Sequence, residues 1–454
     1  MIKSSLTLFI AFVVSVLLTL LLFLGEQPSA IAYTAGITTF VAILWVTEAL
    51  PIPATSLIPF AFFPLAGVIT HNEAASALGN HVIVLLMAAS MLSKGLEKAN
   101  LHKRLAIYML RLTGTGSGLK LVLGFMMTTA VLSMWISNTA TMLMILPMAM
   151  AIIKATENKR FGIALLLGIA YAASLGGVGT PIGTPPNIIF MSVYEETQGM
   201  EYNFVEWMKT GIPIVLIGIP VMAMWLGRGL GKVDDINLPE PGEWSIAEKR
   251  VLAIFGTVAL GWVFRPFWTG WLDITTISDS TIAVAGVVAM FMVNSGHKRE
   301  KLLDWDTAND IPWGMLLLFA GGICIAKAFS ASGLSMVMGQ WMTALSSMPV
   351  VLLVLFICLF VTFLTEITSN TATATLLMPI LAAAGAGVGV DPKLLMIPAA
   401  ISASCAFMLP VATAPNAIAY STGVFNIKTM AREGIMLNVL VAFVVTAVCL
   451  VTLQ

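Results

Sequence analysis

Charged residues are scarce in this chain. Asp, Glu, Lys and Arg together make up 10% of its 454 residues, whereas soluble domains carry about 25%. Hydrophobic residues make up 58% and the mean hydropathy is +0.95, which indicates an integral membrane protein. The 23 basic and 23 acidic residues cancel. Without a basic tail or an aromatic-basic patch, nucleic acid is not an expected partner.

Cysteine and histidine are also rare, at four residues each. They are Cys324, Cys358, Cys405 and Cys449, and His71, His81, His102 and His297. The cysteines lie in apolar segments without paired spacing, so we expect buried free thiols instead of disulfides. The histidines share no helix face, which argues against a zinc site. The sequence shows no nucleophile–base pair, phosphate loop or metal-ligand cluster, so we expect no enzyme.

Long apolar segments fill most of the chain. With about 20 apolar residues per membrane crossing, eleven segments are predicted to be transmembrane helices: 6–24, 31–50, 53–69, 81–97, 161–194, 211–229, 251–268, 281–295, 311–329, 394–423 and 433–453. A cleaved signal peptide is the alternative for the first segment. Its apolar core of roughly 19 residues exceeds the 7 to 15 of signal peptides, which favours a retained anchor.

Two further apolar segments, 121–154 and 349–386, are each interrupted by a Ser-Asn-Thr triplet. The triplets are Ser137-Asn138-Thr139 and Ser369-Asn370-Thr371, and they lie 232 residues apart. Splitting the first segment at its triplet leaves arms of about 16 and 14 residues, or roughly 21 to 24 Å, whereas the hydrocarbon core is near 30 Å thick. We therefore predict that each segment is a re-entrant hairpin.

Other motifs repeat at a similar spacing. Thr184-Pro185-Pro186-Asn187 matches Thr413-Ala414-Pro415-Asn416 at an offset of 229 residues, and Lys94 with Leu101 matches Lys327 with Leu334 at an offset of 233. Each half thus contains a helix with a lysine, a hairpin with the triplet, and a helix broken at Thr-x-Pro-Asn. An odd number of crossings separates equivalent points, so the halves are inverted repeats of the kind that supports alternating access.

The charges predict an orientation. With eleven crossings and two hairpins, one side carries Lys3, Lys98, Lys103, Arg104, Arg111, Lys120, Lys154, Lys159, Arg160, Arg228, Lys232, Lys249, Arg250, Lys298, Arg299, Lys301, Lys428 and Arg432. The other side carries Glu26, Glu73, Glu195, Glu196, Glu201 and Asp273, with few bases. The positive-inside rule makes the basic side cytoplasmic. We expect a multi-pass protein of the inner (plasma) membrane with its N-terminus inside and its C-terminus outside.

The four interruptions predict an anion site. Thr is a good N-cap and Pro is favoured at the first helical position, so Thr139, Thr184, Thr371 and Thr413 are each expected to begin a half-helix. Four helix N-termini would then face the middle of the membrane. Each carries unpaired N–H groups and an effective charge near +0.5, which suits a small dianion.

The preceding half-helices predict a cation site at the same places. Their unpaired carbonyls are expected near Ile136, Gly183, Thr368 and Ala412, beside the amides of Asn138 and Asn370. Such oxygens suit a hard cation such as sodium. A cation bound beside a dianion lowers the cost of bringing its charge into low dielectric, which couples the two.

These motifs resemble those of the divalent anion/sodium symporters, and the resemblance covers essentially the whole chain. It implies a homodimer in which each protomer has a scaffold domain, at 1–112 and 231–347, and a transport domain that moves as an elevator, at 113–230 and 348–454. By motif, the substrate would bind Ser137, Asn138, Thr139, Thr184, Pro185, Ser369, Asn370, Thr371 and Thr413. One sodium would bind Ser133, Ser137, Asn138 and Gly183, and another Thr365, Thr368, Asn370 and Ala412. Many family members have Pro where this chain has Ala414.

We therefore expect sodium-coupled symport of a small divalent anion, most simply a C4-dicarboxylate such as succinate, malate or fumarate. Sodium would be co-transported and not a prosthetic group. Alternatives are sodium-independent dicarboxylate exchange, sodium-coupled transport of citrate or sulfate, and an anion channel.

Some of these residues have simpler explanations. A single Ser-Asn-Thr triplet would more often join membrane helices by hydrogen bonds, although two copies with matching flanks favour a site. Glu366, three residues before the second triplet, is either functional or a structural hydrogen-bonding group. Lys94 and Lys327 lie near the ends of spans, where snorkelling is the ordinary explanation.

Overall fold

The computed structural model describes residues 2–113, 117–156, 158–231, 240, 242–274, 276–296, 300–342 and 348–453. In these ranges all regular structure is helical, apart from one isolated bridge between Asn294 and Lys301. The all-helical architecture predicted from composition is confirmed. Among the residues used to predict orientation and metal binding, Lys232, His297, Lys298 and Arg299, and the side chain of Lys3, lie outside the described part.

The helices fall into four consecutive groups. The first is α1 (Ile2–Leu24), α2 (Ser29–Thr47), α3 (Ile52–Thr55), α4 (Ile58–Leu65), α5 (His71–Leu78), α6 (His81–Lys98) and α7 (Leu101–Thr113). The second is α8 (Gly118–Ser133), α9 (Asn138–Thr156), α10 (Lys159–Gly176), the 3-10 turn η1 (Gly177–Gly179), α11 (Pro185–Gln198) and α12 (Phe204–Leu226). The third is α13 (Ile246–Leu272), α14 (Asp279–Met292), α15 (Trp305–Asn309), α16 (Trp313–Ser332) and α17 (Leu334–Met342). The fourth is α18 (Val350–Thr365), α19 (Asn370–Val388), α20 (Lys393–Ala403), α21 (Ala414–Ser421) and α22 (Ile427–Thr452).

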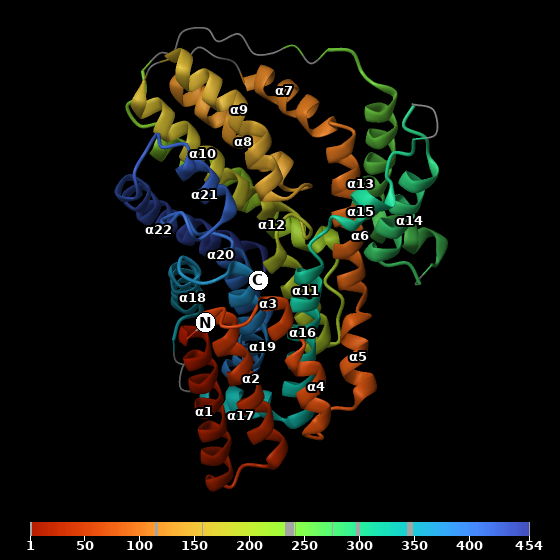
Figure 1. Ribbon diagram of the computed structural model, residues 1–454, viewed down its shortest axis with the longest axis vertical. Helices are drawn as coiled ribbons and strands as arrows, with labels where there is room; N and C mark the ends of the chain where they lie inside the picture. Colours follow the sequence, from red (N-terminus) through yellow and green to blue (C-terminus); the bar gives the residue numbers. More distant parts are fainter. Residues whose placement is uncertain are drawn as a thin grey trace.

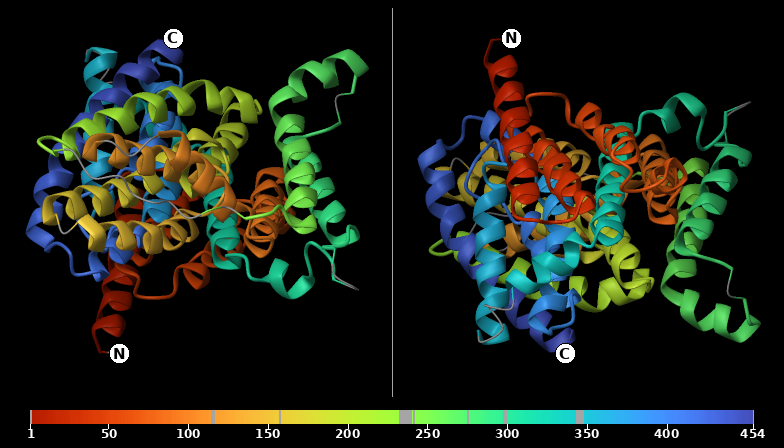
Figure 2. Two further views of the ribbon diagram at one scale, coloured as in Figure 1. Left: turned by 90° about the horizontal axis from the view of Figure 1, so that it is seen from above. Right: turned by 90° about the horizontal axis from the view of Figure 1, so that it is seen from below.

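The second and fourth groups have the same plan. Each is a helix–turn–helix hairpin, then a helix that breaks and resumes, then one long helix. The two groups pack against each other, with α12 on α22, α10 on α21, and α11 on α19 and α20. The first and third groups contact each other through pairs such as α6 with α14. Helices α13 and α14 project at one edge of the molecule and are joined to the rest mainly through α6 (Figures 1 and 2).

The hairpin turns lie at the predicted triplets. In each hairpin four residues, 134–137 or 366–369, separate the two helices. The side chain of Ser137 accepts a hydrogen bond from the backbone N–H of Ala140 at 3.2 Å, and that of Ser369 accepts one from Ala372 at 3.5 Å. Serine is among the best N-cap residues, so the first residue of each triplet ends the turn and starts the second arm.

Arm lengths correct one step of the sequence argument. The first arms, α8 and α18, have 16 residues each, but the second arms, α9 and α19, have 19 each. At 1.5 Å per residue the second arms extend about 28 Å, close to the hydrocarbon thickness. Only the first arms are shorter than a crossing, so arm length alone does not establish re-entrance.

The spans also differ in detail from those predicted. Ten helical runs among the described residues are long and apolar enough to cross a membrane, and α9 and α19 are two of them. Three predicted spans give shorter helices instead. The segment 53–69 breaks between α3 and α4, 281–295 gives the 14-residue α14, and 394–423 stops at Ala403 and resumes at Ala414.

Four short helices lie outside the predicted segments: α5, α7, α15 and α17. Helices α7 and α17 follow α6 and α16 and begin at Leu101 and Leu334, the positions already matched between the repeats. At 13 and 9 residues, both are too short to cross a membrane. Arg104 anchors α7, since its Nε lies 2.8 Å from Glu248 Oε1 and its guanidinium stacks on the ring of Trp244.

Candidate functional site

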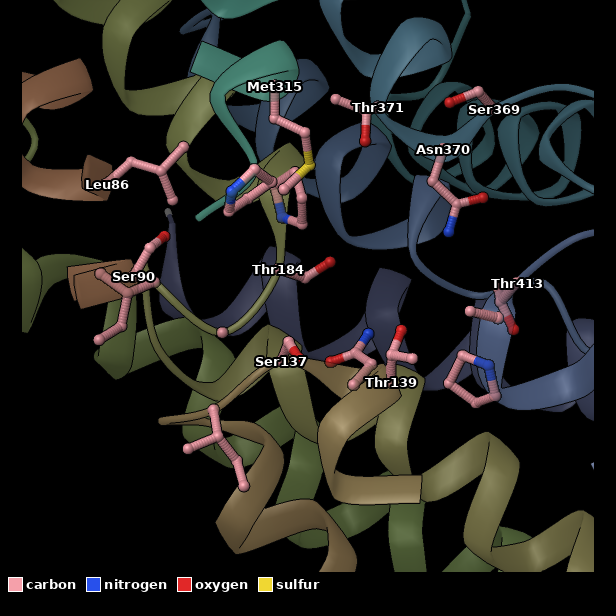
Figure 3. Close-up of a pocket in the computed structure, with 18 of the residues that line it drawn as sticks. Leu86, Ser90, Ser137, Thr139, Thr184, Met315, Ser369, Asn370, Thr371 and Thr413 are labelled. Carbon is pink, nitrogen blue, oxygen red and sulfur yellow. The ribbon is translucent and has the colours of Figure 1, made fainter. Parts of the chain in front are cut away.

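A cavity of about 1000 Å³ lies where the two hairpin tips meet the two broken helices. Twelve of the fourteen predicted site residues line it: Ser137, Asn138, Thr139, Gly183, Thr184, Pro185, Thr368, Ser369, Asn370, Thr371, Ala412 and Thr413. Figure 3 shows the side chains of Ser137 and Thr139 from the first triplet, of the whole second triplet, and of Thr184 and Thr413 around one space. The other two, Ser133 and Thr365, are fully buried beneath the hairpin tips. Folding thus brings together residues more than 200 positions apart.

At the first hairpin three oxygen atoms cluster under the tip. Ser133 Oγ lies 2.7 Å from Asn138 Oδ1 and also 2.7 Å from the carbonyl oxygen of Ala173, in α10. A hydroxyl has one proton to donate, whereas an amide oxygen and a carbonyl only accept. One of the two close oxygen pairs therefore has no shared proton.

The second hairpin has the same cluster. Thr365 Oγ1 lies 2.6 Å from Asn370 Oδ1 and 3.0 Å from the carbonyl oxygen of Ala403, at the end of α20. Both clusters combine hydroxyl, amide and carbonyl oxygens, which are the donors that hard cations take from proteins. The carbonyls of Ala173 and Ala403 were not foreseen. The sequence carries no signal for them, because their position depends on how α10 and α20 pack against the hairpins.

Close backbone packing brings a third element to the first cluster. A Cβ built on Gly177 would lie 2.8 Å from the carbonyl oxygen of Gly183 and 3.0 Å from Asn138 Oδ1, and one built on Gly183 would lie 2.4 Å from the Gly177 oxygen. Glycine is therefore needed at both positions. The predicted sodium ligands Asn138 and Gly183 thus lie against the same glycine.

Two buried asparagines hold the helix breaks in shape. Asn187 Nδ2 donates to the carbonyls of Gly177 at 3.0 Å and Thr180 at 2.8 Å, and Asn416 Nδ2 donates to those of Ala406 at 2.9 Å and Leu409 at 3.1 Å. All four acceptors repeat at the 229-residue offset. The asparagine of each Thr-x-Pro-Asn motif therefore satisfies carbonyls that the broken helix leaves free.

The predicted helix starts need two corrections. Thr184 and Thr413 are N-caps as predicted, and the Thr413 side chain accepts from the N–H of Asn416 at 3.2 Å. Thr139 and Thr371, however, are the second residues of α9 and α19, because the preceding serines cap these helices.

The four helix N-termini are also unequal as anion sites. Helix α11 begins with Pro185 and Pro186, which have no N–H to donate. Helix α21 begins with Ala414, followed by Pro415, and so keeps one more donor. The N-terminal regions of α9 and α19 contain no proline until Pro147 and Pro379. The prediction of four equivalent donor tips is therefore wrong for α11.

Glu366 is engaged in the break between α20 and α21. Its Oε1 accepts from the backbone N–H groups of Phe407 at 2.7 Å and Met408 at 2.8 Å and from Asn438 Nδ2 at 2.8 Å, and its Oε2 accepts from Leu409 N–H at 3.0 Å. Glu366 is 3% exposed. Of the two readings that the sequence left open, this geometry matches the structural one. Asn438, its partner from α22, was missed.

The first and third groups of helices supply the facing wall of the cavity. Leu86 and Ser90 of α6 and Met315 of α16 lie opposite the triplets (Figure 3). Toward the mouth, Lys94 Nζ lies 2.7 Å from Asp310 Oδ2 and 3.4 Å from Glu97 Oε2. The hydrogen bond from the Lys94 ammonium lowers the pKa of the Asp310 carboxyl, so Asp310 is charged at neutral pH.

The prediction of buried free thiols is confirmed. The four cysteines are free and buried. No cluster of His, Cys, Asp and Glu suitable for a metal occurs within the described ranges. His81 instead pairs with Glu195, with 2.7 Å between Nε2 and Oε2.

Comparison with known families identifies the chain. Residues 42–396 match a family described as citrate transporters, which is more than half of the chain. The chain belongs to the citrate transporter family. The chain is also similar to the sodium-dependent dicarboxylate transporters SdcS of Staphylococcus saprophyticus and Staphylococcus aureus, each 39% identical over 95% of this chain and 88% of their own length. The resemblance to sodium-coupled anion transporters is confirmed, and so is the expectation of a multi-pass membrane transporter instead of an enzyme.

Solved structures support the fold of this citrate transporter family member. The YdaH transporter of Alcanivorax borkumensis has a TM-score of 0.56 and 14% identity, covering 86% of this chain and 87% of its own. MtrF of Neisseria gonorrhoeae, from a class of antimetabolite efflux pumps, has a TM-score of 0.57 and 13% identity, covering 83% and 82%. At these identities the likeness concerns the fold alone.

Proposed function

We propose that this chain is a symporter that carries a C4-dicarboxylate together with sodium across the membrane. The observation that carries the proposal is the pair of three-oxygen clusters under the two hairpin tips, directly beside a cavity lined by both triplets. The proposed cation donors and anion donors lie within a few residues of one another at each turn. The sodium-dependent dicarboxylate transporters at 39% identity support the same pairing of solutes.

For the substrate, the hydroxyls, amides and backbone N–H groups at the hairpin tips bind the two carboxylates. The residues are Ser137, Asn138, Thr139, Thr184, Pro185, Ser369, Asn370, Thr371 and Thr413. Each helix N-terminus contributes about 0.3 to 1 kcal/mol toward an anion, and up to about 2 kcal/mol when partly buried. Because α11 begins with two prolines, the N–H donors come chiefly from α9, α19 and α21, while Pro185 shapes the cavity wall.

For sodium, one ion binds Ser133, Ser137, Asn138 and the carbonyl of Gly183, and the other binds Thr365, Thr368, Asn370 and the carbonyl of Ala412. The clusters add the carbonyls of Ala173 and Ala403 to these two sets. A sodium ion at each cluster supplies the positive charge that the close oxygens lack, and it lies next to the substrate charge. Binding of one solute thereby favours binding of the other.

The charge of the cavity favours a dianion over a trianion. Lys94 is the one basic residue among those that line the cavity in the described chain, and it is committed to Asp310 and Glu97. A third carboxylate would face Leu86, Ser90 and Met315, which carry no charge. We therefore place C4-dicarboxylates ahead of citrate, the substrate for which the family is described.

The fold suggests how the site alternates between the two sides. The second and fourth helix groups, in segments 113–230 and 348–454, form a transport domain that carries the tips and the breaks. The first and third groups, in 1–112 and 231–347, form the scaffold of a homodimer. In the proposed orientation the mouth beside Lys94 faces the cytoplasm, because Lys98 and Lys103 follow on the basic side. The transport domain then moves as an elevator past the scaffold wall.

Uptake into proteoliposomes tests the proposal. Labelled succinate is expected to accumulate with an inward sodium gradient, to saturate, and to show counterflow. Equal uptake in choline buffer would contradict symport and favour sodium-independent exchange. Conductance without saturation or counterflow would indicate a channel. Competition by malate, citrate and sulfate then ranks the anions, and stronger inhibition by citrate or sulfate than by malate would contradict the preference for C4-dicarboxylates.

A further inference from the structure

Three ion pairs join the scaffold to the transport domain, and all three lie on one face of the molecule. Lys327 of α16 reaches Glu196 of α11, with 3.2 Å between Nζ and Oε2. Arg265 of α13 reaches Glu201 after α11, with 2.7 Å between Nη2 and Oε1. The third is His81 of α6 with Glu195 of α11, with 2.7 Å between Nε2 and Oε2, which is an ion pair when the imidazole is protonated. Between described residues, no other ion pair joins the two domains as defined above.

A backbone hydrogen bond strengthens the same face. Asp279, at the start of α14, accepts from the N–H of Phe204 at 3.0 Å and lies 2.8 Å from Arg265 Nε. Asp279 and Arg265 are both buried. One scaffold carboxylate therefore holds the first residue of α12 as well as the arginine that pairs with Glu201.

The paired face lies opposite the cavity mouth. On α6, His81 and Lys94 are 13 residues apart, or about 20 Å along the helix. On α16, Met315 at the cavity and Lys327 are 12 residues apart, or about 18 Å. The two helices run in opposite directions as parts of inverted repeats, so the first residue of α6 and the last turns of α16 reach the same face. Helix α11 contacts both of them and ends there.

The glutamates on α11 are placed where an isolated helix would not favour them. Glu195 and Glu196 lie in the last turn of α11, beside the negative end of the helix dipole. Basic side chains from two scaffold helices neutralise them in the observed arrangement. When the transport domain moves away from the scaffold, these carboxylates lose their partners.

The second repeat has no counterpart of this arrangement. Lys94 occupies the position equivalent to Lys327, but its partners Glu97 and Asp310 both belong to the scaffold. At the 229-residue offset, Glu195 and Glu196 correspond to Val424 and Phe425, which follow the end of the shorter helix α21. Each repeat thus has a lysine at the equivalent position of its scaffold helix. Only Lys327 has an acidic partner in the transport domain.

We propose that these three ion pairs hold the transport domain in the observed position, with the cavity open beside Lys94, and so favour that state over its mirror-related alternative. Lys327, Arg265 and His81 are positioning residues and do not touch the substrate. This inference rests on the elevator division proposed above. In the proposed orientation the ion pairs close the external face, and the cavity is open to the cytoplasm.

Two single-cysteine reporters test the inference on the intact protein. Ser93 of α6 lines the cavity. Ala326, its equivalent at the 233-residue offset, is fully buried in α16, one turn beyond Gly322, where a Cβ would lie 2.3 Å from Thr375 of α19. A membrane-impermeant maleimide is expected to label Ser93→Cys from the mouth side and to leave Ala326→Cys nearly unlabelled. The four native cysteines are buried, so the unaltered chain provides the background.

Breaking one pair should shift both reporters in opposite directions. Pairs of this exposure typically change an equilibrium by about 1.5- to 5-fold. Glu196→Gln is expected to lower the ratio of the Ser93→Cys labelling rate to the Ala326→Cys labelling rate by such a factor, and Glu195→Gln/Glu196→Gln/Glu201→Gln should lower it further. The charge swap Glu196→Lys/Lys327→Glu is expected to restore the original ratio.

A matched control separates this effect from a general loss of charge. Glu433→Gln breaks a 2.8 Å ion pair with Arg228 that lies within the transport domain and away from the residues that line the cavity, and both labelling rates should stay unchanged. Unchanged labelling in the Glu196→Gln and triple variants, or an equal shift in Glu433→Gln, would overturn the inference. Because labelling needs no substrate, the inference and the proposed function can fail separately. If the reporters shift but dicarboxylate uptake is absent, the ion-pair inference stands and the proposed function fails. If uptake is normal but the reporters do not shift, the proposed function stands and the inference fails.

Discussion

Ser133 Oγ and Asn138 Oδ1 lie 2.7 Å apart across the turn that joins α8 to α9. The asparagine starts the second arm and lines the cavity, whereas the serine ends the first arm and is fully buried. Thr365 and Asn370 repeat this relationship at 2.6 Å. Each pair connects the buried interior of a hairpin to the cavity surface, which places the proposed cation donors next to the proposed anion donors.

The two asparagines are expected to be indispensable for transport. Asn138→Ala and Asn370→Ala each remove an amide oxygen from a cluster and an amide from the cavity wall. We expect either change to abolish sodium-dependent succinate uptake in proteoliposomes. Size-exclusion chromatography should still show a folded protein of unchanged assembly. Uptake at the normal rate by both variants would refute the site.

The buried hydroxyls should control sodium more than substrate. Ser133→Ala removes the central oxygen of the first cluster. A bond to a charged group contributes about 1.5 kcal/mol, so we expect the sodium concentration for half-maximal uptake to rise about tenfold. Thr365→Ser keeps its hydroxyl and is the matched control, with little change expected.

Thermal unfolding reports on the same cluster without transport. An ion that binds the folded state alone stabilises it by about 2.7 kcal/mol at a concentration of 100 Kd. Sodium should therefore raise the Tm of the purified protein, choline should not, and Ser133→Ala should reduce the rise. A Tm that responds equally to both cations in the unaltered chain would contradict sodium binding.

Ala414 gives this chain one N–H donor that a proline would remove. It is the first residue of α21, the same position that Pro185 occupies in α11. Proline is favoured there, so Ala414→Pro should leave the helix intact. We expect the KM for succinate to rise roughly tenfold or more if that N–H binds a carboxylate, with unchanged sodium dependence.

The reciprocal change supplies the comparison. Pro185→Ala adds a donor at the matched position and should leave the KM unchanged or lower it. If Ala414→Pro transports succinate with an unaltered KM, the N-terminus of α21 is not part of the anion site.

Glu366 should matter through the loop that it holds. Glu366→Gln preserves size, but it replaces one acceptor oxygen with an amide donor that faces donating N–H groups such as that of Leu409. Leaving such buried groups unsatisfied costs about 1–3 kcal/mol. We expect a lower Tm and a higher sodium requirement, since Ala412 lies in the same break.

A milder variant controls for this prediction. Asn438→Ala removes one of the four hydrogen bonds to the carboxylate and should show a smaller effect in the same direction. A Glu366→Gln variant with the Tm and sodium dependence of the unaltered chain would show that the loop does not need the carboxylate.

Local chemistry made several features predictable. Serine caps helices, proline starts them and both interrupt apolar segments, so the hairpin turns at Ser137 and Ser369 and the breaks at Thr184 and Thr413 were visible in the sequence. The 232- and 229-residue offsets related them as repeats. Which residue served as the cap was less certain, because Ser and Thr adjoin in each triplet and both suit the role.

Other features depended on packing. The second arms run to 19 residues because α9 and α19 continue past Pro147 and Pro379, whereas an isolated helix interior tolerates proline poorly. The carbonyls of Ala173 and Ala403 join the oxygen clusters only because α10 and α20 pack against the hairpins. The role of Glu366 could not be decided from the sequence, because its hydrogen-bond partners lie 41 or more positions away in the chain.

The sequence by itself determined that this chain lies in a membrane, that it consists of two related halves, and which polar residues interrupt its helices, because hydropathy and capping act over a few neighbouring residues. Only the tertiary structure decided that both triplets meet at one cavity, that each hairpin gathers three oxygens around one proton, and that the ion pairs between domains lie on a single face. Those are distances between residues far apart in the chain, and packing alone sets them.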